Sequence, residues 1–163
     1  MWQELHLSRA TVFVCAVTLS ACAQPNGPDS GSEEISVQPI ASESNSGFEE
    51  SDRRVIRDTI EWASVWARIY EPFSLKPPLP AIDFSKEQVV VAALGSRPTS
   101  GYVIRITGAS GNGNAIKVRL ESQSPGSGCV LLTVITHPVA VAKLPRTVGS
   151  VAFEETPTVR DCG

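Results

Sequence analysis

The segment from residue 88 to residue 155 is a series of short apolar runs separated by turn residues, and this pattern most restricts the fold. Val89–Leu94 is apolar throughout, as is typical of a central strand covered on both faces. Ile116, Val118 and Leu120 alternate with charged residues, which predicts a strand with one buried face. The intervening SGNGN and SPGSG are turn sequences. We predict strands at Gln88–Leu94, Tyr102–Thr107, Ala115–Ser122, Val130–Thr136, Val139–Leu144 and Ser150–Glu155.

Residues 51–72 follow a helical pattern instead. Apolar side chains recur there every three or four residues, which predicts a helix capped by Ser51 or Asp52 and ended by Pro72. Trp62 and Trp66 could stack on a ligand, but the hydrophobic core is the favoured place because each buries a large apolar area. The stripe comprises Val55, Thr59, Trp62, Trp66 and Ile69, widened by Ile56, Ile60 and Ala63. We therefore expect an α+β fold, with one N-terminal helix packed on a mostly antiparallel β-sheet of about six strands, as a small barrel or a sandwich.

The part of the chain before residue 52 has a different composition. Residues 23–51 are rich in Ser, Pro, Gly and Glu and contain no Lys or Arg. Such a segment has too little apolar surface to offset the entropy lost on ordering. We predict a disordered acidic tether over residues 22–51 and a folded domain over residues 52–163. The basic excess of that domain is too dispersed to indicate nucleic-acid binding.

The first 21 residues resemble an export signal. Their apolar stretch, ATVFVCAVTL, is too short to span a bilayer, and LSAC at Leu19–Cys22 is similar to the lipobox of bacterial lipoproteins. We expect a lipoprotein-type signal peptide at residues 1–21 and a lipid on Cys22. That lipid would anchor the protein at the bacterial cell envelope, facing the periplasm or the cell exterior. A plain secretory signal cleaved after Ala21 is the alternative.

The expected role of each cysteine follows from this signal peptide. Cys15 would leave with the signal peptide and Cys22 would carry the lipid, so Cys129 and Cys162 remain. An even pair in an exported protein predicts a disulfide, which here would tie the C-terminal tail to the core. Two unrelated thiols are the alternative.

Signals of catalysis are sparse. His137 is the single histidine after the predicted signal peptide. The sequence has no G-x-S-x-G motif, no C-x-x-C motif, no histidine cluster and no phosphate-binding glycine loop. We expect a protein that is not an enzyme and that uses no cofactor or metal.

The loop GSRPTSGY at residues 95–102 is longer than a hairpin requires. It combines a proline bend, hydroxyl groups, a glycine and an aromatic ring, which suits a contact loop on a rigid sheet. The candidate partner-binding residues are Arg97, Pro98, Thr99, Ser100, Gly101 and Tyr102. The alternative is that Tyr102 begins the next strand facing inward, after a tight turn at Pro98–Gly101.

The order of several motifs resembles the C-terminal domain of the PrcB-like family. They lie in IDFSKEQVVVAALGSRPTSGYVIRI at Ile82–Ile106 and PGSGCVLLTVITHPVAVAKLP at Pro125–Pro145. EWASVW at Glu61–Trp66 and the ending VAFEE…DCG also fit. Where the family loop often reads T-G-G-Y, Ser100 replaces the first glycine. The family is named for a lipoprotein subunit of a bacterial surface protease complex. The resemblance implies a non-enzymatic, envelope-anchored subunit that binds or stabilises another exported protein, with a protease as the candidate partner.

A second resemblance is to chagasin-type inhibitors of cysteine proteases, which present three loops from an immunoglobulin-like sandwich. PTSGY at Pro98–Tyr102 is similar to one loop, and the glycine-rich Gly126, Ser127 and Gly128 are similar to another. The third is matched only by His137 and Pro138. This resemblance implies an inhibitor as an alternative function. A purely structural envelope lipoprotein is the third possibility.

Overall fold

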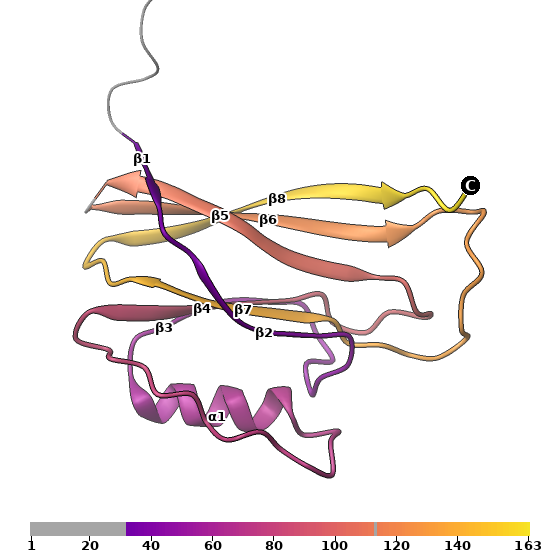
Figure 1. Ribbon diagram of the computed structural model, residues 1–163, viewed down its shortest axis with the longest axis horizontal. Coiled ribbons are helices and arrows are strands. Elements are labelled where there is room, and N and C mark those ends of the chain that lie inside the picture. The colour runs from indigo at the N-terminus through magenta and orange to yellow at the C-terminus, as the bar shows by residue number, and fades with distance from the viewer. Residues whose placement is uncertain (1–31, 113) are drawn as a thin grey trace, which may run out of the picture. The chain divides into compact units, whose positions relative to one another are not determined.

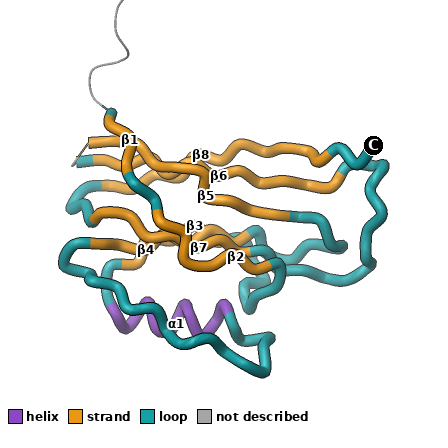
Figure 2. The backbone as a smooth tube through the Cα atoms, viewed as in Figure 1, coloured by secondary structure: helices purple, strands orange, loops and turns teal. Residues whose placement is uncertain are grey.

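The computed structural model describes residues 32–112 and 114–163, which form eight strands and one helix (Figures 1 and 2). The helix α1 spans Thr59–Ile69. The predicted signal peptide, Cys22 and the start of the predicted tether lie outside the described residues. The strands are β1 (Glu33–Ile35), β2 (Gln38–Glu43), β3 (Asp52–Ile56), β4 (Glu87–Ala93), β5 (Val103–Asn112), β6 (Ala115–Pro125), β7 (Val139–Pro145) and β8 (Ser150–Arg160).

The strands form two four-stranded sheets, in the orders β1-β5-β6-β8 and β2-β7-β4-β3. Neighbouring strands are antiparallel, except that β8 runs parallel to β6. The sheets lie face to face, and α1 covers the outer side of the second sheet (Figure 1). The predicted fold class is confirmed at this coarse level, as a mostly antiparallel sandwich with one helix. The described residues contain more strands than predicted, and the helix follows three of them.

The strand β4 separates the two parts of the hydrophobic core. Val90 and Ala92 point into the core between the sheets, whereas Val89, Val91 and Ala93 point toward α1. All five side chains are 0% exposed. Alternating side chains therefore fill both cores, which explains why the run is apolar throughout.

The helix begins at Thr59, so the cap predicted at Ser51 or Asp52 is wrong. Asp52–Ile56 form β3, which pairs with β4 and satisfies backbone groups that a longer helix would have bonded internally. Asp58 is the actual cap, and its Oδ1 accepts a hydrogen bond from the Glu61 backbone N–H at 2.9 Å. An acidic residue followed three positions later by Glu is a capping signal. The periodicity before residue 58 arose because an amphipathic strand adjoins an amphipathic helix.

Trp62 and Trp66 belong to the core, as predicted. They are 1% and 7% exposed, and their ring centroids lie 5.1 Å apart. Their indole N–H groups donate to the carbonyl groups of Pro80 and Pro77, at 2.9 and 3.1 Å. The proline-rich connector is thereby held along the helix. Ile60 is exposed, so the apolar stripe is narrower than predicted. No helix in residues 32–112 and 114–163 is long and apolar enough to cross a membrane.

The tether predicted over residues 22–51 is wrong where β1 and β2 form. These strands pair with β5 and β7, and Ile35 and Ile40 pack against the core. The composition misled because β1 and β2 are edge strands, and edge strands often carry charged residues and proline that prevent pairing with other chains. The folded unit therefore begins before residue 52.

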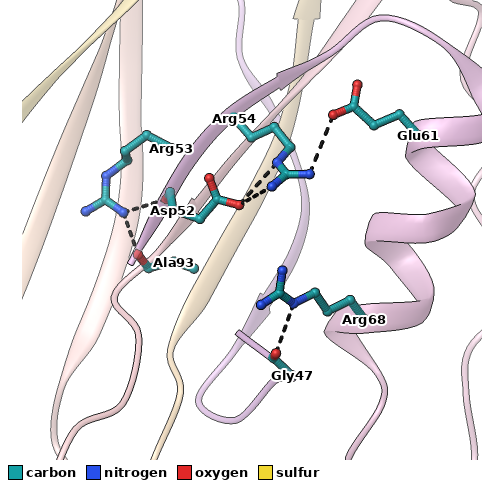
Figure 3. Close-up of polar contacts among 7 residues, drawn as sticks. All are labelled: Gly47, Asp52, Arg53, Arg54, Glu61, Arg68 and Ala93. Carbon is teal, nitrogen blue, oxygen red and sulfur yellow. Dashed lines mark hydrogen bonds and ion pairs between the residues drawn. The ribbon is translucent and has the colours of Figure 1, made fainter. Parts of the chain in front are cut away.

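Arginine side chains hold β3 and the loop before it to the helix (Figure 3). The Nη2 of Arg54 donates to Asp52 at 2.8 Å, and its Nη1 lies 3.7 Å from a Glu61 carboxylate oxygen. Arg68 donates from Nε to the Gly47 carbonyl group at 3.0 Å. Exposed ion pairs such as those of Arg54 contribute little energy. The hydrogen bond from Arg68 joins the loop between β2 and β3 to the helix.

The two ends of the sandwich differ. The chain enters β1 at Glu33, which pairs with Gly111 beside the β5–β6 hairpin. The β4–β5 loop, residues 126–138 and the C-terminus gather at the other end, called the loop end from here on (Figure 1). The candidate loops thus lie far from the point where the chain enters the domain.

Candidate binding surface

The β4–β5 loop is a tight turn held against its neighbour. Gly101 has φ +92°, a conformation that favours glycine. Arg97 and Thr136 exchange backbone hydrogen bonds of 2.8 and 2.9 Å, and the Thr136 hydroxyl donates to the Thr99 carbonyl group at 3.0 Å. Of the predicted contact residues, Pro98 is exposed, and the other five are half-buried. The loop therefore lies along residues 130–136 and presents little side-chain surface of its own.

Tyr102 takes the inward orientation. It is half-buried and packs against the core between the sheets. The Arg97 guanidinium carbon lies 5.8 Å from the centroid of its ring, which orients the arginine along the aromatic face. The aromatic ring of the predicted contact loop is thus part of the domain's own packing.

Residues 130–136 carry the exposed surface at the loop end. They were predicted to form a strand, but they run as an extended loop outside both sheets, with an isolated bridge at Thr136. No charged residue occurs between Pro125 and Ala142. An exposed apolar cluster of this size is typical of an interaction site. The exposed fractions are 102% for Val130, 71% for Leu132, 49% for Val134 and 63% for Ile135. We call Val130–Ile135 the apolar segment.

A disulfide holds the start of this segment. Cys129 and Cys162 are bonded, as the cysteine count predicted. The backbone N–H of Cys129 donates to the Gly126 carbonyl group at 3.2 Å, and that of Gly126 donates to Arg160 at 3.0 Å. The glycine-rich turn at residues 126–128, a predicted secondary loop, therefore connects β6 to the covalent anchor.

Ser100 holds the middle of the segment. Its backbone N–H donates to the Leu132 carbonyl group at 3.0 Å, and its Oγ accepts from the Leu132 N–H at 2.9 Å. A glycine at position 100 could not accept the second of these bonds, because it has no hydroxyl group. The apolar side chains stay exposed while their backbone is fixed.

His137, the other predicted secondary site, follows the segment and lies in a polar cluster. Its Nε2 is 3.1 Å from Ser96 Oγ, and its Nδ1 is 3.0 Å from Asn45 Oδ1. This order of groups is that of a nucleophile, a base and an orienting residue. However, the Ser96 hydroxyl donates to the Glu49 carbonyl group at 3.1 Å, and the backbone N–H groups of Ser96 and Arg97 donate within the domain. Those two groups are not available to stabilise an oxyanion. The cluster ties three loops together, and the neighbouring Pro138 is buried.

A pocket of about 240 Å³ lies beside Arg97 and Tyr102. Arg97 Nε and Thr158 Oγ1 are buried there without a hydrogen-bond partner in the described part of the chain. Burial opposes ionisation of Glu155 in its wall. Hydrogen bonds from Ser122 and Arg53, and the charges of Arg53 and Arg97, nevertheless lower the pKa of that carboxyl group. The pocket wall therefore carries charged groups of both signs, unlike the apolar segment. Among residues 32–112 and 114–163, no three His, Cys, Asp or Glu side chains gather as a metal site.

The fold and this surface define a class of protein, a β-sandwich domain with one covering helix and a held, exposed apolar segment at its loop end. Residues 88–145 match the family model described as PrcB C-terminal, and this segment of the chain is similar to that family. The match runs from β4 to β7 and includes both the β4–β5 loop and the apolar segment. The helix and the C-terminal ending, which also fitted the resemblance, lie outside the matched residues. No curated protein and no solved structure matches the chain significantly.

Sequence reasoning assigned the contact role to residues 97–102 and missed the apolar segment. The run VLLTVI is rich in β-branched and apolar residues, so the sequence predicts a strand there and not an exposed loop. The sequence signal for an exposed segment was the position of this run between a cysteine and the HP dipeptide, in a long stretch without charged residues.

Proposed function

We propose that this protein is a lipid-anchored, non-enzymatic subunit of the bacterial cell envelope that binds and stabilises another exported protein, with a protease as the expected partner. The apolar segment carries the proposal. Covering one large apolar side chain contributes roughly 1.5–3 kcal/mol, so the four exposed side chains of the segment are a large source of binding energy. The family match supports a protease as the partner, because the family takes its name from a subunit of a protease complex.

The position of the segment in the domain supports the same proposal. A lipid on Cys22 would be joined to Glu33 by a stretch of chain that reaches at most about 40 Å. Glu33 lies at the end of the sandwich opposite the apolar segment. The anchor would then be attached at the end of the domain opposite the segment, which leaves the segment accessible to a partner in the periplasm or outside the cell.

The test compares matched variants of the full chain in its native host. Leu132→Ser combined with Val134→Ser removes apolar area from the segment. Val148→Ser removes it from a valine that is also exposed but lies at the opposite end, before β8. Cross-linking followed by mass spectrometry identifies the bound protein, and its half-life in the envelope is then measured.

We expect the double variant to lose the cross-linked protein and shorten its half-life, whereas Val148→Ser leaves both unchanged. Equal cross-linking by all three proteins would contradict the proposal and favour a purely structural lipoprotein. Slowing of a papain-like protease at stoichiometric concentration would instead favour the inhibitor alternative. Retention of the lipid after Cys22→Ala would contradict the proposed anchor.

A further inference from the structure

We propose that the apolar segment is an open strand edge, which receives an extended, uncharged peptide segment of the partner as an added strand. This inference rests on the proposed function and specifies how the partner binds. A strand added at a sheet edge gains affinity from backbone hydrogen bonds and specificity from alternate side chains.

Backbone hydrogen bonds join the segment to the β4–β5 loop at two residues, four positions apart. The N–H groups of Leu132 and Thr136 donate to Ser100 Oγ and to the Arg97 carbonyl group, whereas that of Val134 donates to the Leu132 carbonyl group in a γ-turn inside the segment. Between them, the N–H groups of Leu131, Thr133 and Ile135 have no partner in the described residues. In an extended chain successive N–H groups point to opposite sides. The segment is therefore bonded to the domain at Leu132 and Thr136, and the N–H groups that alternate with these bonds remain free donors.

Charge distinguishes this edge from the four outer strands of the two sheets. An exposed edge invites pairing with other chains, and proteins prevent this with charged residues and proline. Each of the four outer strands has such protection: Glu33 and Glu34 in β1, Pro39 and Glu43 in β2, Asp52, Arg53 and Arg54 in β3, and Glu154, Glu155, Pro157 and Arg160 in β8. Residues 130–136 contain neither a charge nor a proline. Compared with these four outer strands, the segment alone lacks such protection.

The segment is also held ready for a partner. The disulfide at Cys129 fixes its start, Ser100 fixes its middle, and the bridge between Arg97 and Thr136 fixes its end. A strand that is already extended loses less conformational entropy when another strand joins it. The lack of charge favours an uncharged apolar strand as the occupant, because a charged side chain would lose hydration without gaining an ion pair.

The experiment uses the full chain and a probe peptide of alternating Val and Thr residues, capped at both ends and flanked by Lys for solubility. Amide hydrogen exchange is followed by NMR as the peptide is added. We expect new protection at Leu131, Thr133 and Ile135, and little change at Leu132, Val134 and Thr136. Two further peptides carry N-methyl groups on alternate residues, in one register or the other. Because only one side of the added strand would face the domain, one of them should bind and the other should not.

Thr133→Pro removes one outward donor and should weaken peptide binding about fivefold to tenfold, whereas Thr133→Ala should bind like wild type. Thermal unfolding of both variants checks that the domain remains folded. If the proline variant unfolds, the two N-methylated peptides still decide the question.

Several results would overturn the inference. Protection confined to β8 would show that the peptide binds at the edge of that strand and not at the apolar segment. Protection that grows with protein concentration in the absence of peptide would identify a second copy of this chain as the occupant. Protection by phosphatidylglycerol vesicles, but not by peptide, would identify a membrane surface. If the Leu132 and Val134 variants lose the cross-linked protein while no strand pairs, the inference fails and the proposed function stands. If neither effect appears, both fail.

Discussion

Two apolar runs of similar composition have opposite surroundings in this protein. VVVAAL at Val89–Leu94 lies at the centre of a sheet and is almost fully buried, whereas VLLTVI at Val130–Ile135 is largely exposed. The first run forms β4, which has β3 on one side, β7 on the other, and packed layers on both faces. The second is bonded along one side only, to the β4–β5 loop. Burial of an apolar run therefore depends on the strands and layers available around it, and composition alone does not decide it.

The largest expected effect comes from placing a carboxylate in each run. Val90→Asp would bury a charge without a partner in the core between the sheets, which should cost more than about 4 kcal/mol and prevent folding. Val134 is exposed, so Val134→Asp should change the free energy of unfolding by about 0.5 kcal/mol or less. Urea denaturation followed by circular dichroism measures both. A strongly destabilised Val134→Asp would mean that the segment is buried in solution.

Removal of the disulfide is the next effect in size. The double variant Cys129→Ala and Cys162→Ala leaves no free thiol at this position and opens a loop with a sequence separation of 33 residues. Loop-closure entropy predicts a loss of about 3–4 kcal/mol from the free energy of unfolding. Hydrogen exchange at Leu132 should also speed up, because the segment loses its fixed start. Unchanged exchange there would show that Ser100 holds the segment without the disulfide.

The helix layer that covers one face of β4 should weaken at high pH. Burial, followed by the hydrogen bond to Glu43, raises the pKa of the Tyr70 hydroxyl to about 12. The unfolded value is about 10, so the stabilising contribution is complete below pH 10 and is lost as the pH rises toward 12. The free energy of unfolding should fall by at most about 2–3 kcal/mol over this range. Tyr70→Phe should reduce this loss of unfolding free energy at high pH. An identical pH profile for the variant would show that the Tyr70 hydroxyl does not cause the loss.

The smallest effect tests the turn against which the apolar segment packs. An added Cβ at Gly101 would lie 3.0 Å from Leu131 Cδ2 and 3.2 Å from Pro125 Cβ, at a backbone φ of +92°. Gly101→Ala should therefore destabilise the domain by about 1–2 kcal/mol. Gly128→Ala, where the nearest atom is 3.3 Å away and φ is not positive, should cost about 0.5 kcal/mol or less. Thermal unfolding of the pair provides the comparison. Equal losses would show that the turn at Gly101 tolerates a side chain.

Much of the β-sheet could be predicted from the sequence because its signals are local. Alternation over Ile116–Leu120, the glycine-rich turns and the apolar run of β4 each specify a strand or a turn within a few residues. The start of the helix could not be placed as well, because β3 depends on pairing with β4, which lies more than thirty residues away in the sequence. The same reason hid β1 and β2, whose partners β5 and β7 are still more distant.

The sequence by itself determined the β-rich class of the fold, the two tryptophans of the core, the disulfide pair and the match of residues 88–145 to the PrcB C-terminal family model. Only the tertiary structure decided which apolar run is buried, where Tyr102 points and which strand edge stays open. The physical reason is that hydrophobicity and turn chemistry are properties of a local stretch of chain. Burial and hydrogen-bond pairing are relations between stretches, and they exist only once distant segments have been brought side by side.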